Sequence, residues 1–263
     1  MSTILITGGT GDLGSALAQR LAAAGHDVRL MSRRPAPADT RHQWAQTDLR
    51  TGDGLPKAVE GADLILHCAS SPFRDTKNTD VEGTRRLLEA AEATGGTSHI
   101  FYISIVGIDR VPLPYYKQKL AAEKVIEESG LPFSILRAVQ FHTLIDRVLS
   151  GALRLRVTAL PKSFKFQPID SGEVADRMVE YAKKGPSGRL PDLGGPEVRT
   201  LGDLASAWLK ARQKRALILP LPLFGKVASR FRNGYNCSPE HAEGKITWAE
   251  WLEQKYGGHK GTS

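Results

Sequence analysis

Tyr115 and Lys119 are the residues of this 263-residue chain whose types and spacing most directly suggest catalysis. Four positions apart, they lie on one face of a helix. A neighbouring ammonium stabilises a phenolate and so lowers the pKa of a tyrosine from its usual value of about 10. Such a tyrosine can pass a proton to or from a carbonyl or alcohol oxygen. The same spacing also arises by chance, so the pair alone does not establish an enzyme.

A glycine-rich turn near the N-terminus has the spacing of a phosphate-binding loop. Gly8, Gly11 and Gly14 follow a short apolar run and open an amphipathic helix. Glycine permits the tight turn and the close approach of a pyrophosphate, while the helix N-terminus offers free N–H groups. We therefore expect this turn to bind a dinucleotide through Gly8, Thr10, Gly11, Asp12, Leu13 and Gly14.

The end of the next apolar run, Val28–Met31, bears on the choice of cofactor. A carboxylate at this place hydrogen-bonds the ribose 2′-OH of NAD. Here Ser32, Arg33 and Arg34 follow, and the next carboxylate is Asp39. A hydroxyl and two guanidiniums suit a 2′-phosphate. This predicts NADP rather than NAD, the alternative being that both arginines are solvated charges at a strand end.

Short apolar runs alternate with helical patterns through the first half of the chain. The runs lie at residues 3–7, 28–31, 43–47, 62–69, 99–104 and 133–137, and helical patterns at 80–93 and 115–129. This alternation predicts an α/β fold with a doubly wound parallel sheet of the Rossmann type. We expect this domain to cover residues 1–185 and a small C-terminal cap or substrate-binding region to cover residues 186–263.

Composition narrows the remaining classes. With 41% hydrophobic and 24% charged residues, the chain is typical of a globular protein. Its two cysteines exclude a disulfide framework, and no cluster of His, Asp and Glu has metal-ligand spacing, so we expect no metal. No apolar run is long enough for a targeting segment or a membrane span, which predicts a cytoplasmic protein. Monomer and homodimer both stay open.

The net charge of +8 is unevenly distributed. Residues 204–239 contain no carboxylate, but they carry seven Lys or Arg residues around the apolar run Leu217–Phe224. A solvated basic face is the plainest explanation, and an anionic substrate or cofactor phosphate is the next. Contact with nucleic acid or a membrane is the least expected, because the stretch lacks a helix-turn-helix pattern and strongly interleaved aromatic residues.

Several segments together resemble the short-chain dehydrogenase/reductase superfamily in its extended and atypical branches. They are Thr7–Gly14, similar to T-G-x-x-G-x-x-G; Thr47–Leu49, similar to a D-L element; Gly61–Ser70; Asp80–Thr84, similar to N-V-x-G-T with an aspartate in the asparagine place; and Pro114–Lys119, similar to P-Y-x-x-x-K. The linking segments and Phe166–Asp170 are most similar to the NmrA-like NAD(P)H-binding group. That group includes reductases and non-catalytic redox sensors.

The resemblance implies roles for individual residues. It implies Asp48 and Leu49 beside the adenine, Ala69, Ser70 and Ser71 beside the cofactor, and Lys119 on the nicotinamide ribose. It implies Tyr115 as the acid–base group and Ser104 as the residue that holds the substrate oxygen. Gln140 and His142, which follow the run at 133–137, are candidate substrate contacts. We expect His67 and Cys68 to be structural.

These observations favour an NADP-dependent oxidoreductase acting on a small carbonyl, alcohol or activated double bond. A non-catalytic NADP(H) sensor that docks a protein partner is one alternative, and a nucleotide-sugar epimerase or dehydratase is another. The Tyr115–Lys119 pair favours an enzyme over a sensor. The short segment between Ser104 and Tyr115 and the small C-terminal region argue against a large sugar-nucleotide pocket.

Overall fold

The computed structural model describes residues 1–72, 75–95, 97 and 99–257. The chain divides into two compact units, each discontinuous in the sequence. Unit 1 comprises Met1–Ser104, Pro114–Arg137 and Val174–Pro191, and unit 2 comprises Ile105–Leu113, Ala138–Glu173 and Asp192–Ser263. This division differs from the single boundary expected near residue 185, because the chain passes repeatedly from one unit to the other.

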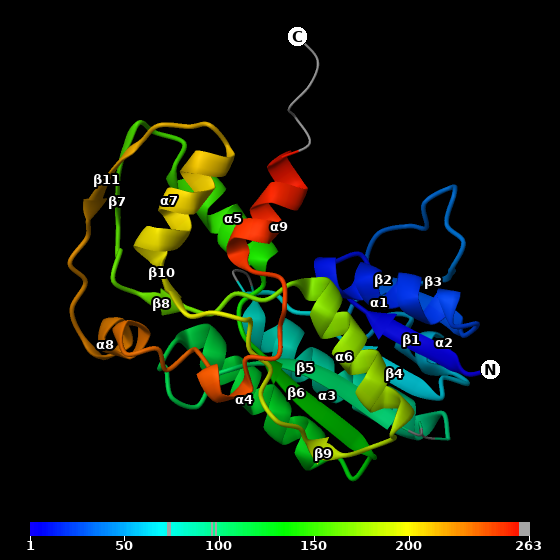
Figure 1. Ribbon diagram of the computed structural model, residues 1–263. Coiled ribbons are helices and arrows are strands. Elements are labelled where there is room, and N and C mark those ends of the chain that lie inside the picture. Colours follow the sequence, from blue (N-terminus) through cyan, green and yellow to red (C-terminus); the bar gives the residue numbers. More distant parts are fainter. Residues whose placement is uncertain (73–74, 96, 98, 258–263) are drawn as a thin grey trace. The chain divides into compact units, whose positions relative to one another are not determined.

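Unit 1 is built on a seven-stranded sheet with the order β3-β2-β1-β4-β5-β6-β9 (Figure 1). Its strands are β1 (Thr3–Thr7), β2 (Asp27–Ser32), β3 (Gln43–Gln46), β4 (Leu64–His67), β5 (His99–Ile105), β6 (Phe133–Ala138) and β9 (Gly188–Arg189). The pairs β1–β2, β1–β4, β2–β3, β4–β5 and β6–β9 are parallel. The predicted doubly wound α/β fold is therefore confirmed. The strand order reverses between β1 and β4, where ligands of such sheets bind.

Helices cover both faces of this sheet (Figure 1). They are α1 (Asp12–Ala23), α2 (Leu55–Val59), the π-helical turn η1 (Lys77–Glu82), α3 (Gly83–Ala93), α4 (Pro114–Glu127) and α6 (Ser171–Lys183). The helical stripe of α1 buries Leu13, Leu17 and Leu21. On the side of α2, α3 and α4, the core joins strand residues such as Ile65 to helix residues such as Leu87. Burial of each such side chain stabilises the fold by about 1.5–3 kcal/mol, so these apolar stripes hold the strand ends in place.

Unit 2 contains short strands and a group of helices. The strands are β7 (Val157–Leu160), β8 (Lys165–Phe166), β10 (Arg199–Thr200) and β11 (Leu217–Pro220); the helices are α5 (His142–Ala152), α7 (Leu201–Ala211), α8 (Lys226–Arg232), the 3₁₀ turn η2 (Pro239–His241) and α9 (Trp248–Tyr256). β11 pairs with β7 in parallel, and β10 pairs with β8 antiparallel. Asp146 of α5 accepts hydrogen bonds from Trp208 of α7 and Tyr256 of α9, each at 2.7 Å. This buried carboxylate ties the three helices together.

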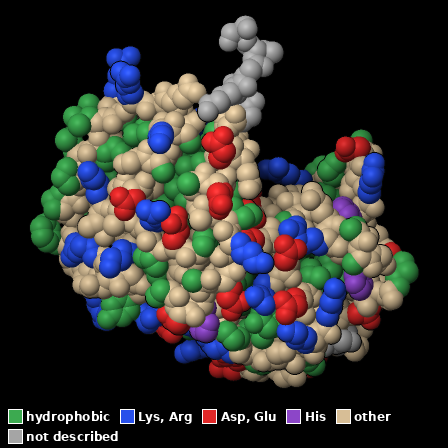
Figure 2. Space-filling view, viewed as in Figure 1, with side chains coloured by type: hydrophobic (Ala, Val, Ile, Leu, Met, Phe, Trp, Pro, Cys, Tyr) green, Lys and Arg blue, Asp and Glu red, His purple; other side chains and the backbone are tan. Residues whose placement is uncertain are grey.

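The described residues were searched for charged patches, membrane-spanning helices and metal-binding clusters. In Figure 2, acidic and basic side chains are intermingled over the elements of unit 1. Among the described residues, no helix is long and apolar enough to cross a lipid bilayer. Over the same part of the chain, no three His, Cys, Asp or Glu side chains gather where they could hold a metal ion.

Candidate functional site

The glycine-rich turn joins β1 to α1 and lies against the end of β4. Gly8 has a φ of +65°, and a Cβ there would lie 2.9 Å from the backbone of Ala69. A Cβ on Gly14 would overlap the Gly8 carbonyl oxygen. Only glycine therefore allows these segments to approach so closely. No side chain caps α1, whose N-cap is Gly11, so its first amides are available to an anion.

This cradle has the close backbone approach and the uncapped helix start that a dinucleotide pyrophosphate requires, and its role in binding stays a prediction. Thr10, Gly11 and Asp12 are exposed at its mouth, while Leu13 is buried and anchors the helix to the sheet. Exposed N–H groups at a helix N-terminus attract phosphate by both hydrogen bonding and the helix dipole. The residues present would hold a dinucleotide without rearrangement of the turn.

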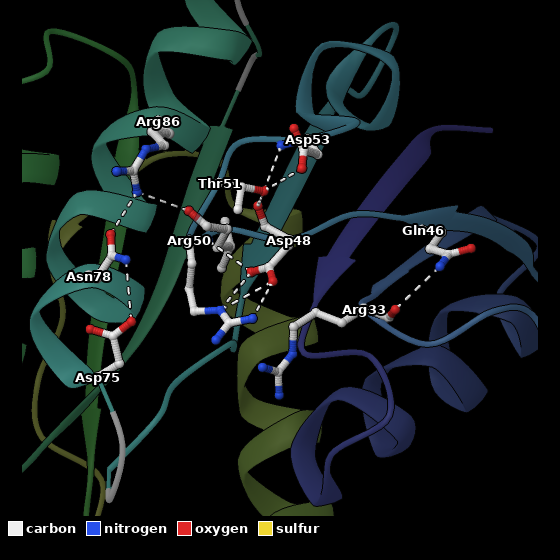
Figure 3. A network of polar contacts seen from close by, with 10 residues as sticks. Arg33, Gln46, Asp48, Arg50, Thr51, Asp53, Asp75, Asn78 and Arg86 are labelled. Carbon is white, nitrogen blue, oxygen red and sulfur yellow. Dashed lines mark hydrogen bonds and ion pairs between the residues drawn. The ribbon is translucent and has the colours of Figure 1, made fainter.

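The end of β2 carries the residues expected to select NADP. Ser32 Oγ accepts a hydrogen bond from the Arg34 amide at 3.1 Å, and Trp44 Nε1 donates to the Arg34 carbonyl at 2.9 Å. These bonds fix the backbone of the turn and leave both arginine side chains exposed. In Figure 3, the Arg33 side chain extends toward Asp48 and Arg50.

Asp48 forms an ion pair that the sequence analysis did not identify. Arg50 Nη2 lies 2.7 Å from Asp48 Oδ2, and the Arg50 amide donates to Oδ1 at 2.9 Å. The hydrogen bond from the Arg50 side chain is the main reason that the pKa of Asp48 lies below its usual value, and the charge of Arg33 lowers it further. Two guanidiniums therefore surround this carboxylate (Figure 3). The signal available in the sequence was the arginine that directly follows the D-L element, two residues after Asp48.

Leu49 has a packing role in this region. Its side chain is buried, and its carbonyl accepts a hydrogen bond from Arg86 Nη1 at 3.1 Å. Arg86 also donates to Asn78 Oδ1, and Asn78 donates to Asp75 (Figure 3). The loop after β3 is thereby tied to η1 and α3, which holds Asp48 in position.

A second polar network lies at the end of β4. Ser70 Oγ donates to Asp80 Oδ1 at 2.5 Å, and the Ser71 amide donates to Asp80 Oδ2 at 3.0 Å. Tyr115 Oη lies 2.7 Å from Ser70 Oγ. Because the single Ser70 hydrogen is directed to Asp80, Ser70 accepts and the Tyr115 phenol donates. Tyr115, Ser70 and Asp80 thus form a hydrogen-bonded chain, and Asp80 is the aspartate that stands in the motif's asparagine place.

Lys119 does not contribute to this chain. Its Nζ donates to the Ile103 carbonyl at 2.9 Å and lies 4.0 Å from the centroid of the Tyr102 ring. Burial lowers the pKa of Lys119 to about 8, although the charges of Asp80 and Glu123 oppose that shift. Burial also raises the pKa of Tyr115 well above its usual value, and Asp80 adds to the rise. Burial of Tyr115 therefore outweighs any lowering of its pKa by the Lys119 charge, and the hydrogen bond that opposes the rise comes from the contact with Ser70.

Ser104 is buried on β5, and its hydroxyl has no hydrogen-bond partner among the described residues. Its expected role on the substrate oxygen stays a prediction. The nearby Glu123 Oε2 lies 2.7 Å from Arg137 Nη2 and 2.8 Å from Arg189 Nη2. Although burial alone would raise it, these guanidiniums, with the Ser104 hydroxyl nearby, hold the pKa of Glu123 below its usual value. The serine bonded to Tyr115 is thus Ser70, which had been expected only beside the cofactor.

A buried histidine fixes the end of β4. Thr7 Oγ1 accepts from the amides of Cys68 and Ala69, both at 3.1 Å, so its hydrogen is directed to His67 Nδ1 at 2.7 Å. His67 Nε2 in turn lies 2.9 Å from Thr84 Oγ1, which donates to the Asp80 carbonyl. Burial lowers the pKa of His67 to about 3 and raises that of the Cys68 thiol to about 12. Both residues stay uncharged and hold the backbone from which Ser70 projects.

The two candidate substrate residues belong to unit 2 and are buried there. Gln140 accepts a hydrogen bond from Asn236 at 3.4 Å. His142 begins α5, donates to the Ile246 carbonyl at 3.0 Å and packs against the rings of Trp248 and Trp251, which stack on each other. Burial lowers the pKa of His142. These contacts explain both residues as parts of the unit 2 core rather than as groups at an open surface.

Comparison with known proteins gives this site its context. The profile of a family described as NAD(P)H-binding matches residues 8–184, which includes the glycine cradle, the Asp48 region and α4. The chain belongs to this NAD(P)H-binding family. Nicotinamide cofactor binding follows from that membership. The fold is also that of a solved short-chain dehydrogenase/reductase superfamily protein from Agrobacterium tumefaciens with bound NAD, at 20% identity and a TM-score of 0.73.

Individual relatives have different names. The chain is 35% identical over 147 residues to a chloroplastic protein of Arabidopsis thaliana named for a high chlorophyll fluorescence phenotype, which covers 53% of this chain and 37% of the relative. It is 28% identical over 207 residues to a (4-alkanoyl-5-oxo-2,5-dihydrofuran-3-yl)methyl phosphate reductase of Streptomyces griseus, covering 75% and 69%. This chain therefore spans less than half the length of the plant relative.

Solved structures extend the likeness of fold to nearly the whole chain. An NADPH-dependent quinone oxidoreductase from Escherichia coli has a TM-score of 0.75 at 21% identity, with 96% of this chain and 99% of that chain covered. At this level of identity the comparison establishes the shared fold. The chemistry of the present chain must be argued from its own side chains.

Proposed function

We propose that this chain is an NADP-dependent reductase in which Tyr115 donates a proton to the oxygen of a small carbonyl compound or of an activated double-bond system. The hydrogen-bonded chain Tyr115–Ser70–Asp80 is the observation that carries the proposal. It holds the phenol at the end of β4, where the family's cofactor lies, and ligands of such sheets bind at these strand ends. The Streptomyces relative is named as a reductase, which supports the same class of reaction.

The protonation of Tyr115 favours the reductive direction. Because burial raises its pKa, the phenol keeps its proton at neutral pH. A neutral phenol is a proton donor, which suits reduction of a carbonyl group rather than oxidation of an alcohol. Asp80 fixes Ser70, and Ser70 orients the phenol oxygen by accepting its hydrogen. Donation to the substrate requires that hydrogen to turn from Ser70 to the substrate oxygen. When bound, the nicotinamide supplies the hydride that reduces the substrate carbon.

We assign the cofactor contacts by position. The glycine cradle would hold the pyrophosphate, Ala69, Ser70 and Ser71 would border the nicotinamide half, and Lys119 would support its ribose as in the family. Arg33 would contact the 2′-phosphate of NADP, because its side chain is exposed and extends toward Asp48 and Arg50, and Asp48 is the residue assigned to the adenine (Figure 3). Arg34 and Ser32 would also contact the 2′-phosphate.

A panel of small carbonyl and enone compounds tests the proposal through NADPH oxidation. We expect Tyr115→Phe to lose about 10²–10⁴-fold in kcat, as removal of a general acid does, while retaining NADPH binding. Tyr116→Phe is the matched control, because it removes the neighbouring hydroxyl of the same helix. Equal turnover by wild type and Tyr115→Phe would contradict the assignment.

A non-catalytic NADP(H)-binding role is the second candidate. It is favoured by relatives named as photosystem II assembly factors, which match about half of this chain. In a purely structural role, the bond from Tyr115 to Ser70 would only hold α4 to β4. Tight NADPH binding by wild type, without turnover of any panel member and with unchanged affinity in Tyr115→Phe, would favour this candidate over the reductase.

A further inference from the structure

A two-stranded ribbon of unit 2 presents an apolar face to solvent. Val157 pairs with Leu217 and Ala159 with Leu219, and alternate residues of a strand point to opposite faces. Val157, Leu217 and Leu219 are 53%, 59% and 45% exposed, whereas Leu160, on the other face, is buried. The solvent-facing side of a sheet ordinarily carries polar residues. Contact with water therefore does not account for apolar residues on the exposed face of this ribbon.

The apolar face continues into the segments that flank the ribbon. Phe224 is 85% exposed and Leu155 is 72% exposed. The loop after β11 is held in place, since the Leu221 amide donates to the Leu160 carbonyl at 2.8 Å and Arg232 donates to the Leu223 carbonyl at 2.7 Å. We call this surface the apolar ribbon; it consists of Leu155, Val157, Leu217, Leu219, Leu221, Leu223 and Phe224.

The apolar ribbon lies within two stretches of sequence that contain no carboxylate. Both β7 and β11 belong to such stretches, residues 147–169 and 204–239. The first contains five cations and the second seven: Arg147, Arg154, Arg156, Lys162 and Lys165, then Lys210, Arg212, Lys214, Arg215, Lys226, Arg230 and Arg232. Because the two strands run parallel, the cations that precede them lie at the same end of the ribbon. Figure 2 shows green side chains along the edge where Figure 1 places β7 and β11, with basic side chains nearby.

We propose that the apolar ribbon docks this protein on the surface of an anionic lipid bilayer. Its leucines and Phe224 would enter the boundary between headgroups and acyl chains, and the surrounding Lys and Arg residues would contact lipid phosphates. Two long acid-free stretches meeting at one apolar surface match a negatively charged bilayer in both charge and polarity. The docking is interfacial, in keeping with the absence of a spanning helix among the described residues.

Other partners fit this surface less well. The centre of a protein interface is depleted of lysine, whereas the two stretches that carry the apolar ribbon contain five lysines. Proteins that bind single-stranded nucleic acid stack bases on aromatic side chains, and Phe224 is the single aromatic member of the apolar ribbon. Long aliphatic side chains beside cations are instead the composition of surfaces that bind membrane interfaces.

Vesicle flotation tests the proposal with the full chain. Vesicles of phosphatidylcholine alone are compared with vesicles that contain phosphatidylglycerol in addition, at low and high salt. We expect binding to the anionic vesicles, about tenfold or more above binding to the neutral ones, that weakens as salt rises. Failure to bind anionic vesicles at low salt would overturn the proposal.

Variants separate the two parts of the surface. Lys214→Glu with Arg215→Glu should reduce binding to anionic vesicles at least about tenfold, since each surface cation contributes a factor of about five. Lys124→Glu with Lys183→Glu reverses two exposed charges of unit 1 and should leave binding nearly unchanged. Equal losses in both double variants would indicate attraction by net charge alone and would overturn a specific docking face.

Insertion has its own measurement. In a Phe224→Trp variant, lipids brominated on their acyl chains should quench the added tryptophan fluorescence, with the wild-type chain as the blank. Phe224→Ser should weaken vesicle binding about tenfold, and Val198→Ser, which alters an exposed apolar residue outside the ribbon, should not. Thermal unfolding checks that each variant is folded. Absence of quenching would overturn insertion of the apolar ribbon into the bilayer. Self-association of the free chain that Phe224→Ser abolishes would assign the surface to a second copy of the chain instead.

Discussion

The candidate site of unit 1 has a buried end and an exposed end, and they are held together differently. At the buried end, Asp80 is 1% exposed and binds neutral hydroxyl and amide donors. At the exposed end, the Asp48 side chain is 22% exposed and pairs with Arg50, whose side chain is 41% exposed. Hydrogen bonds in a dry environment are costly to break, whereas exposed ion pairs contribute little because water and salt screen them.

The two ends therefore serve different purposes: the buried end positions the Tyr115 phenol, and the exposed end influences the choice of cofactor. The buried end fixes the Tyr115 oxygen through a chain in which each hydrogen has one acceptor. The exposed end presents guanidiniums that can adjust to the charge of a ligand. We therefore expect changes at the buried end to affect folding and turnover, and changes at the exposed end to affect the choice of cofactor.

The largest effect is expected at Glu123, which is buried on the helix that carries Tyr115 and Lys119. Glu123→Ala leaves the buried Arg137 guanidinium without its carboxylate, which should lower the free energy of unfolding by about 3–5 kcal/mol. Urea denaturation measures this change. The control Glu180→Ala removes an exposed carboxylate paired with Arg177 and Lys184 and should have no measurable effect. Similar losses in both variants would remove the distinction between buried and exposed ion pairs.

The fold was predictable from the sequence because it depends on periodic patterns. Apolar runs such as residues 3–7 and 99–104 appear as β1 and β5, and the glycine spacing placed the start of α1. The division into units was not predictable, because it depends on contacts between distant segments. The two-residue strands β8, β9 and β10 are likewise too short to leave a pattern in the sequence.

The side-chain partners of the site were less accessible to sequence reasoning. Ser104 and Ser70 both stand near strand ends, but a strand directs successive side chains to opposite faces, and a motif does not reveal which face meets α4. The structure leaves the buried Ser104 hydroxyl without a hydrogen-bond partner among the described residues and brings Ser70 to Tyr115 across 45 positions of sequence. The aspartate at position 80 was visible as a departure from the motif, whereas its bond to Ser70 required the fold.

The pH dependence of turnover sharpens the assignment of the buried end. Burial lowers the pKa of Lys119 to about 8, so its ammonium is lost as the pH rises above that value. If the charged form supports the cofactor, kcat/KM should be constant below about pH 8 and fall about tenfold per pH unit above it. Lys119→Met should be slower and should lack this decline. A decline that persists in Lys119→Met would assign the titration to another group.

The smallest effect is expected at the exposed end, where Arg33→Ala changes one solvated charge. Loss of a charge-assisted hydrogen bond to the 2′-phosphate should weaken NADPH binding about tenfold and leave NADH binding unchanged. Fluorescence titration with both cofactors measures the difference, and added salt should reduce it. Arg34→Ala measures the contribution of the second guanidinium of that turn, Lys57→Ala is the control outside the assigned contacts, and Arg50→Ala separates the two guanidiniums beside Asp48. Should Arg50→Ala lose NADPH selectivity while Arg33→Ala retains it, the phosphate would lie on the Asp48 side of the exposed end, and the ion pair would have to open for NADP to bind.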